Sequence, residues 1–272
     1  MKYKINAVYF SATGTTQKTV KRLVEELSVS FNEKTVNYKD LTLPSGRVNS
    51  LAFTEEDIVI VGVPVYAGRV PNVLLDYLKN NLKADGAKAV AVVLYGNRNY
   101  DDSLIELNDI LKMNGFNVIA AGAFIGEHSF SNILAKGRPD EKDLEKVSDF
   151  AKQIHTKIIS DNWQLPVNIP GNEEYRPYYK PKDKEGNSVD IRKVTPKTNS
   201  DCTDCKLCVS VCPMGSINYE DVSKLNYICI KCGACIKICP VNAKYYDDEN
   251  YLKHKYELEI EFAERKEPEV FL

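Results

Sequence analysis

The most restrictive feature of the sequence is a cysteine motif that occurs twice near its end. Residues 202–213 read C-T-D-C-K-L-C-V-S-V-C-P, and residues 229–240 read C-I-K-C-G-A-C-I-K-I-C-P. Both copies follow the pattern C-x2-C-x2-C-x3-C-P, and together they contain all 8 cysteines of the chain. Three thiolates at this spacing can reach three corners of an iron–sulfur cube from one short loop. The last cysteine of each copy is directed away from that loop by Pro213 or Pro240.

The spacing therefore predicts two [4Fe–4S] clusters that exchange their fourth ligands. One cluster is expected on Cys202, Cys205, Cys208 and Cys239. The other is expected on Cys229, Cys232, Cys235 and Cys212. Zinc knuckles and disulfides are the alternatives. Zinc sites usually use two C-x2-C pairs set farther apart, often with histidine, and disulfides are unusual without a secretory signal.

The segment resembles the bacterial two-cluster ferredoxin family, and all the ligand positions of that family match. The resemblance implies a small α+β ferredoxin domain, which we expect over residues 199–248. The chain has 272 residues, too many for such a module alone, so a second and larger core is expected.

Charge and hydropathy restrict the partners and the location. The formal net charge of −2 argues against a role on nucleic acid or on a membrane surface. The N-terminus shows no charged-then-apolar leader, and no apolar run approaches the ~20 residues that a membrane span needs. We therefore expect a soluble, cytoplasmic protein whose thiols stay reduced.

Residues 1–160 alternate strand-like and helix-like segments. The expected strands are 5–10, 36–38, 58–63, 89–95 and 118–125, and the expected helices begin near residues 16, 71, 102 and 144. The run from Ile58 to Val63 is continuously apolar, as in a parallel strand covered on both faces. This pattern predicts an α/β fold with a doubly wound, five-stranded parallel sheet. Ligands of such sheets bind beyond the carboxyl ends of the strands.

The turn after the first strand is rich in hydroxyl groups. It contains Ser11, Thr13, Gly14, Thr15 and Thr16 and leads directly into a helix. Backbone N–H groups, the helix dipole and these hydroxyls together favour a phosphate group. The turn lacks the lysine and second glycine of the P-loop and is not G-x-G-x-x-G. From the residues alone, a helix N-cap with additional threonines is an equally good interpretation.

The sequence S-x-T-G-x-T between a first strand and a helix resembles the phosphate loop of flavodoxins, which binds the phosphate of FMN. The resemblance covers residues 1–160 and implies that the loops after the third and fourth strands enclose the isoalloxazine. The residues implied are Pro64, Tyr66, Ala67 and Gly68 in one loop, and Gly96, Asn97, Arg98 and Tyr100 in the other. Tyr100 corresponds in placement to the outer stacking tyrosine, and Tyr66 is its counterpart. The chain departs from the family by lacking a tryptophan in the first of these loops and by carrying Arg69 there.

Three further segments carry weaker signals. His128, in the loop after the fifth strand, is expected to be a hydrogen-bonded loop histidine rather than a flavin or substrate contact. Residues 161–198 form a Pro/Tyr-rich linker, which we expect to lie across one or both domains because it is too aromatic for a free tether. In the tail, residues 249–272, we expect a helix that braces the ferredoxin domain, although an alternation of apolar residues and glutamates also suits an edge strand.

These features predict an electron-transfer protein that links one-electron clusters to FMN, which accepts one or two electrons. Its partners would be a redox-protein donor and acceptor. The alternative is an oxidoreductase in which FMN reduces a small substrate above Tyr66, Arg69 and His128. A redox sensor is a weaker alternative, because no regulatory output is evident. The sequence predicts neither the direction of electron flow nor the oligomeric state.

Overall fold

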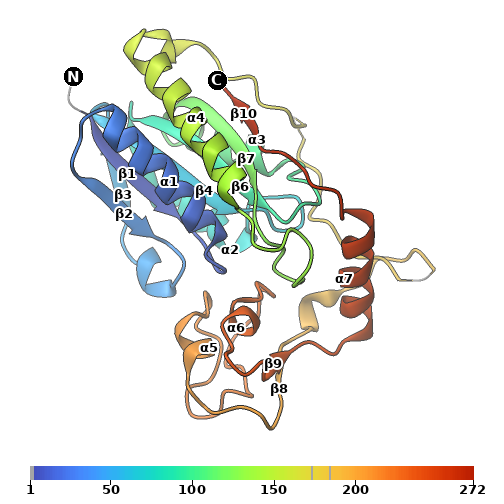
Figure 1. Cartoon of the computed structure of the whole chain (residues 1–272). Coiled ribbons are helices and arrows are strands. Elements are labelled where there is room, and N and C mark those ends of the chain that lie inside the picture. Colours follow the sequence, from blue (N-terminus) through green and yellow to red (C-terminus); the bar gives the residue numbers. More distant parts are fainter. Residues whose placement is uncertain (1–2, 173, 184) are drawn as a thin grey trace.

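The structure is a computed structural model that describes residues 3–172, 174–183 and 185–272. It consists of a large α/β part, built mainly from the N-terminal residues, and a small cysteine-rich part. Figure 1 shows the cysteine-rich part, in orange, below one end of the central sheet. The long C-terminal helix, in red, lies beside both parts, and the chain then returns to the sheet.

The central sheet has six strands in the order β10-β7-β6-β4-β1-β2. The strands are β1 (Lys4–Tyr9), β2 (Val36–Asp40), β4 (Asp57–Pro64), β6 (Lys88–Tyr95), β7 (Asn117–Ile125) and β10 (Glu269–Phe271). The first five are parallel, and β10 runs antiparallel to β7. The five parallel strands expected from the sequence are thus confirmed, and a sixth strand is added at one edge.

Helices cover both faces of the sheet (Figure 1). The helices are α1 (Thr15–Ser30), α2 (Asn72–Asn80), α3 (Ser103–Met113) and α4 (Glu141–Ile159). On one face α1 and α4 bury Leu23 and Phe150, and on the other α2 and α3 bury Leu74 and Leu107. The four helices expected to begin near residues 16, 71, 102 and 144 are thus present, and they begin at Thr15, Asn72, Ser103 and Glu141.

Short elements complete the α/β part. A parallel pair outside the main sheet is formed by β3 (Leu51–Thr54) and β5 (Leu82–Asp85), and one 3-10 turn is η1 (Pro44–Arg47). The sequence analysis did not predict this pair, because strands of only four residues are too short to show a clear period.

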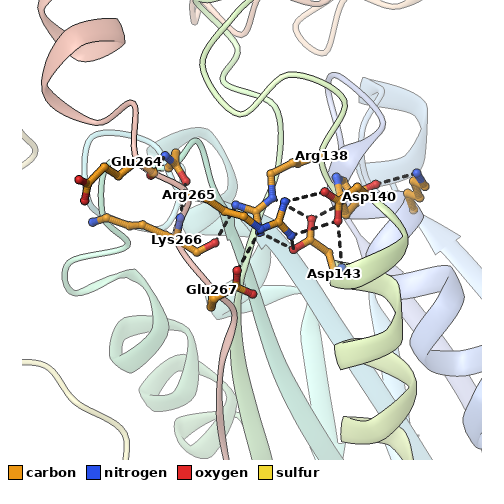
Figure 2. Close-up of polar contacts among 10 residues, drawn as sticks. Arg138, Asp140, Asp143, Glu264, Arg265, Lys266 and Glu267 are labelled. Carbon is orange, nitrogen blue, oxygen red and sulfur yellow. Dashed lines mark hydrogen bonds and ion pairs between the residues drawn. The ribbon is translucent and has the colours of Figure 1, made fainter.

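The C-terminal tail forms the expected helix, α7 (Glu249–Glu261), which includes most of the residues whose alternation with glutamates also suited a strand. The strand β10 lies farther along the chain, where the sequence analysis did not expect one. Figure 2 shows how the segment between them is fastened: Arg265 Nη1 lies 2.6 Å from Asp140 Oδ2, and Arg265 Nη2 lies 3.3 Å from Asp143 Oδ1. Arg138 pairs with the same Asp143 and donates to the backbone oxygen of Lys266 at 2.7 Å. The tail therefore braces the α/β part as well as the cysteine-rich part.

The segment after α4 lies against the α/β part, and we call residues 165–172 and 174–179 the strap. Arg176 Nη2 lies 2.8 Å from Asp102 Oδ1 at the start of α3, and the Tyr175 hydroxyl donates to Asp109 at 2.7 Å. The Tyr178 hydroxyl donates to the backbone oxygen of Val70 at 2.7 Å. These contacts fix the path of the chain toward the cysteine-rich part.

The cysteine-rich part contains little regular structure. Its elements, with the turns that precede it, are η2 (Asn162–Gln164), η3 (Ile191–Lys193), β8 (Lys197–Thr198), α5 (Leu207–Ser210), α6 (Ala234–Lys237) and β9 (Lys244–Tyr245). Strands β8 and β9 pair antiparallel. A separate cluster around Val194, Tyr246 and Tyr251 packs with Phe130 of the α/β part. This cluster joins the linker, the cysteine-rich part and α7 to the large part.

Candidate functional site

A cleft opens at the carboxyl ends of β1, β4, β6 and β7, and we call it the strand-end cleft. It is lined by Ala12, Thr13, Thr15, Thr16, Pro64, Val65, Tyr66, Leu94, Tyr95, Gly96, Gly126, Glu127, His128, Ser129 and Cys232. Four loops of the α/β part therefore meet there, at the edge where doubly wound sheets bind ligands. The last lining residue comes from the cysteine-rich part.

The loop after β1 supplies the start of α1 to this cleft. Gly14 has φ +84° and precedes the first residue of the helix, and the Ser11 hydroxyl accepts a hydrogen bond from the Gln17 amide at 3.0 Å. The first amides of a helix have no intrahelical acceptor and so can bind an anion. Gly126 allows this turn to come close, because a Cβ there would lie 2.8 Å from Thr15. Of the predicted loop residues, three threonines line the cleft, whereas Ser11 and Gly14 shape the loop from outside it.

The loop after β4 is a tight turn from Tyr66 to Arg69, with left-handed backbone at Ala67 and Gly68. Only Pro64, Val65 and Tyr66 of this loop reach the cleft. Burial, and after it the neighbouring Cys232, raises the pKa of Tyr66. The phenol therefore stays protonated beside the cysteine.

Arg69 and Gly68 lie away from the cleft lining. Arg69 is paired with Glu106 at 2.7 Å and lies over the rings of Tyr175 and Tyr178. Gly68 packs so closely on the next loop that a Cβ would lie 2.4 Å from Asp101 Oδ2. Arg69 thus anchors the strap.

The loop after β6 contributes Gly96 to the cleft, whereas Asn97, Arg98 and Tyr100 have other partners. The Asn97 amide donates to the backbone oxygens of Phe262 at 2.6 Å and Glu264 at 2.7 Å. Tyr100 is buried, and its hydroxyl donates to Glu269 Oε2 at 2.9 Å. This position does not support the stacking role that the resemblance implied for Tyr100, because the C-terminal tail holds the ring in the core.

Arg98 also contacts other parts of the chain. It pairs with Asp101, lies over the ring of Tyr179, and accepts through its backbone oxygen a hydrogen bond from Lys266. The loop is therefore held between the strap and the tail.

The loop after β7 supplies cleft residues that the sequence analysis did not assign to the flavin. His128 packs closely on Gly96: a Cβ added to Gly96 would lie 2.3 Å from Cδ2 of the imidazole. Burial, followed by the charges of His254 and Lys237, lowers the pKa of His128 to about 4. Its Nδ1 accepts a hydrogen bond from the Phe130 amide at 3.1 Å, so the neutral ring carries its proton on Nε2. The sequence signal was the position of this loop at the same sheet edge.

The cysteines line two separate cavities. The outer cysteine cavity is lined by Cys202, Thr203, Asp204, Cys205, Lys206, Leu207, Cys208, Val222, Cys239, Val241 and Lys244. The inner cysteine cavity is lined by Pro196, Cys212, Pro213, Met214, Ser216, Ile217, Leu225, Cys229, Ile230, Cys232, Gly233, Ala234, Cys235 and Tyr246. Their volumes, openings included, are about 310 and 350 Å³. Each cavity thus combines three cysteines of one motif copy with the last cysteine of the other.

The donor set of these cavities suits iron–sulfur clusters. Backbone amides donate to sulfur in matched positions of the two copies, for example Asp204 N to Cys202 Sγ and Lys231 N to Cys229 Sγ, both at 3.4 Å. Such N–H···S bonds stabilise the negative charge of a cluster. Burial raises the pKa of the Cys235 thiol to about 12, so a cationic centre is needed to hold it as a thiolate. Within the described residues, no three His, Cys, Asp or Glu side chains form a group that could hold a metal ion. The four cysteines of each set instead line a cavity, which suits a cluster rather than a single ion.

Cys232 lines both the inner cysteine cavity and the strand-end cleft. Close docking makes this possible, because a Cβ on the next residue, Gly233, would lie 2.4 Å from the backbone oxygen of Ser129. Lys237 Nζ pairs with Glu127 at 2.5 Å beside this contact. On the other side, Arg47 Nη2 donates to a backbone oxygen of the cysteine-rich part at 2.7 Å.

Comparisons with known proteins identify both parts. Residues 7–126 match the flavodoxin domain family, and residues 171–254 match the 4Fe-4S dicluster domain family. No curated protein matches the chain.

Among solved structures, a flavodoxin of Streptococcus pneumonia TIGR4 is 19% identical, with a TM-score of 0.40 over 56% of this chain and 98% of that one. A flavodoxin from the domain Archaea is 16% identical (TM-score 0.38, 57% and 99%), and oxidised flavodoxin 2 from Bacillus cereus is 19% identical (TM-score 0.39, 57% and 99%). In the described residues, no helix is both long and apolar enough to span a bilayer.

Proposed function

Because the chain joins a flavodoxin domain to a 4Fe-4S dicluster domain, we propose that it transfers electrons between two [4Fe–4S] clusters and FMN within one molecule. When bound, the clusters exchange single electrons and FMN exchanges one or two. The observation that carries the proposal is that Cys232 lines both the inner cysteine cavity and the strand-end cleft. One ligand side chain thereby separates the two cofactor sites.

The proposed binding residues follow from the linings of the three sites. For the FMN phosphate these are the amides and hydroxyls of Thr13, Thr15 and Thr16, with Ser11 and Gly14 setting the loop. For the isoalloxazine they are Pro64, Tyr66, Gly96 and His128, the last as an Nε2–H donor. For the clusters they are Cys202, Cys205, Cys208 and Cys239 in the outer cavity and Cys212, Cys229, Cys232 and Cys235 in the inner one. The crossed ligand sets are supported by the cysteines that share each cavity.

The outer cysteine cavity is proposed to exchange electrons with partner proteins. Cys205 is exposed, whereas Cys232 and Cys235 are buried. A separate redox protein can therefore approach the outer cavity without displacing the flavodoxin domain. We place this exchange in the cytoplasm, where cysteine ligands stay reduced.

The alternative function, reduction of a small substrate by FMN, has less support. Its substrate would need space over the flavin, but the rim of the strand-end cleft is in contact with the dicluster domain through Gly233 and Ser129. Arg69, a candidate substrate contact, is paired with Glu106 outside the cleft.

The composition of the purified protein tests the proposal. An anaerobic preparation reconstituted with iron, sulfide and FMN should hold two clusters, about eight irons per chain, together with one FMN. Preparations that bind zinc instead, or that saturate at half this iron content, would contradict the two-cluster assignment.

A further inference from the structure

Lys244 is a buried cation with an unusual environment. Its residue is 3% exposed, and its Nζ donates to Thr198 Oγ1 at 2.7 Å and to the backbone oxygen of Val222. Both acceptors are uncharged, and across the described parts of the chain Lys244 forms no ion pair with a carboxylate. An ammonium removed from water without a counter-charge costs several kcal/mol. The environment therefore calls for a negative charge nearby.

The outer cysteine cavity is where that charge can be. Lys244 lines this cavity together with its four cysteines. The amide of Ala243, which directly precedes Lys244, donates to Cys239 Sγ at 3.2 Å. Lys244 therefore belongs to the segment that contacts a proposed ligand sulfur.

The internal repeat supplies a direct comparison. Lys244 follows the last cysteine of its copy, Cys239, by the same number of residues as Ile217 follows Cys212. Ile217 is buried and lines the inner cysteine cavity in the matching way. The fold therefore accepts an apolar side chain at this position, and the lysine is a specific feature of the outer cavity.

The other lysines near the cysteines have different surroundings. Lys206 pairs with Asp204 at 2.7 Å. Lys231 is half-buried beside the inner cavity, where its Nζ donates to the backbone oxygens of Cys229 at 3.0 Å and Arg192 at 3.1 Å. Lys244 alone of these three is both buried and without a carboxylate partner.

We propose that Lys244 is the internal counter-cation of the iron–sulfur cluster in the outer cysteine cavity and raises its reduction potential. This inference rests on the proposed function, which puts a cluster in that cavity. A cluster bound by four thiolates is negative and becomes more negative on reduction, so a fixed positive charge favours the reduced form.

Potentiometric titration followed by electron paramagnetic resonance tests the proposal on the reconstituted full chain. Lys244→Met removes the charge at similar side-chain length. It should make reduction of the outer cluster at least tenfold less favourable, which lowers its reduction potential by about 59 mV for one electron. Lys244→Arg keeps the charge and should keep the potential near that of the unchanged protein. Lys224→Met removes an exposed lysine of the same part, which pairs with Asp221 at 3.0 Å and lines neither cysteine cavity, and should leave both potentials in place.

The possible outcomes separate the inference from the proposed function. If the unchanged protein yields only one cluster signal, the two-cluster function is wrong, and the counter-cation role of Lys244 is wrong with it. If both signals are present and Lys244→Met leaves the outer potential unchanged, the counter-cation role is wrong. If Lys244→Met loses the outer cluster but Lys244→Arg retains it, the charge role is supported. If both variants lose the cluster, the charge role is overturned, because the shape of the side chain and not its charge then determines binding.

Discussion

The two domains of this chain depend on different kinds of interior. The flavodoxin domain buries apolar side chains on both faces of a six-stranded sheet. The buried apolar cluster of the dicluster domain consists of Cys208, Ile217, Val222 and Cys235, and two of these are proposed ligands. Small domains with so little core need an additional source of stability, such as a metal centre. The comparison indicates that the first domain folds around its own side chains and the second around its cofactors.

Removal of iron should have the largest effect, and it should affect only one domain. After chelation, amides of residues 199–246 should lose their protection against hydrogen exchange, because metal binding supplies much of the folding free energy there. Amides of β4 and β6 should stay protected, and FMN should still bind. Hydrogen exchange measured by mass spectrometry checks both. If the dicluster domain stays protected against exchange without iron, it does not depend on its clusters for folding, and the proposed difference between the two domains is wrong.

Replacement of single cysteine ligands should distinguish the two clusters of the dicluster domain from each other. Cys212→Ser should damage the cluster that the motif at 229–235 holds, and Cys239→Ser the cluster that the motif at 202–208 holds, because the fourth ligands cross over. Each variant serves as the control for the other in paramagnetic resonance spectra. Loss of the cluster of its own motif copy in each variant would refute the crossed assignment.

A change at the flavin loop should weaken cofactor binding and leave the fold intact. Gly14 has φ +84°, a conformation that costs other residues about 1–2 kcal/mol. Gly14→Val should therefore weaken FMN about tenfold, since 1.4 kcal/mol corresponds to that factor. Asn tolerates this conformation, so Gly14→Asn is the matched control. Fluorescence titration measures both variants, and riboflavin, which lacks the phosphate, should be affected less. If the affinities for riboflavin and FMN fall equally, this loop does not bind the phosphate.

A smaller effect is expected where the strap contacts α3. The hydrogen bond from Arg176 of the strap lowers the pKa of Asp102, although burial opposes this shift. A lowered carboxyl pKa means that the contact stabilises the protein fully above the ordinary pKa of aspartate, about 4, and less as the pH falls below it. Asp102→Asn should cost about 1–3 kcal/mol at neutral pH, measured by urea unfolding, and the difference should shrink in acid.

The control for this change is Asp190→Asn, because Asp190 pairs with Arg192 on the surface. Exposed pairs contribute little, so no measurable change is expected. If Asp102→Asn behaves like this control, the strap does not depend on the buried contact.

Features encoded by local pattern could be predicted from the sequence. The continuous apolar runs of β4 and β6 identified strands covered on both faces, and the cysteine spacing predicted the grouping that the two cavities bring together. The position of Tyr100 could not be predicted, because its partner Glu269 is 169 residues away in the sequence. Asn97 likewise bonds to the tail, 165 residues away. The placement of Cys232 beside the strand-end cleft depends on docking between domains, which no local period encodes.

The central claim is that both cofactor sites belong to one electron path within a single molecule, with Cys232 between them. Rapid mixing of the loaded protein with a one-electron reductant, repeated at several protein concentrations, tests this most directly. Electrons that enter the dicluster domain should appear on the flavin at a rate independent of protein concentration. Replacement of residues 171–198 by a Gly/Ser segment of equal length should slow this transfer, because a flexible linker lowers the fraction of time spent docked. A rate that rises in proportion to protein concentration would contradict the account and indicate two tethered carriers that react by collision.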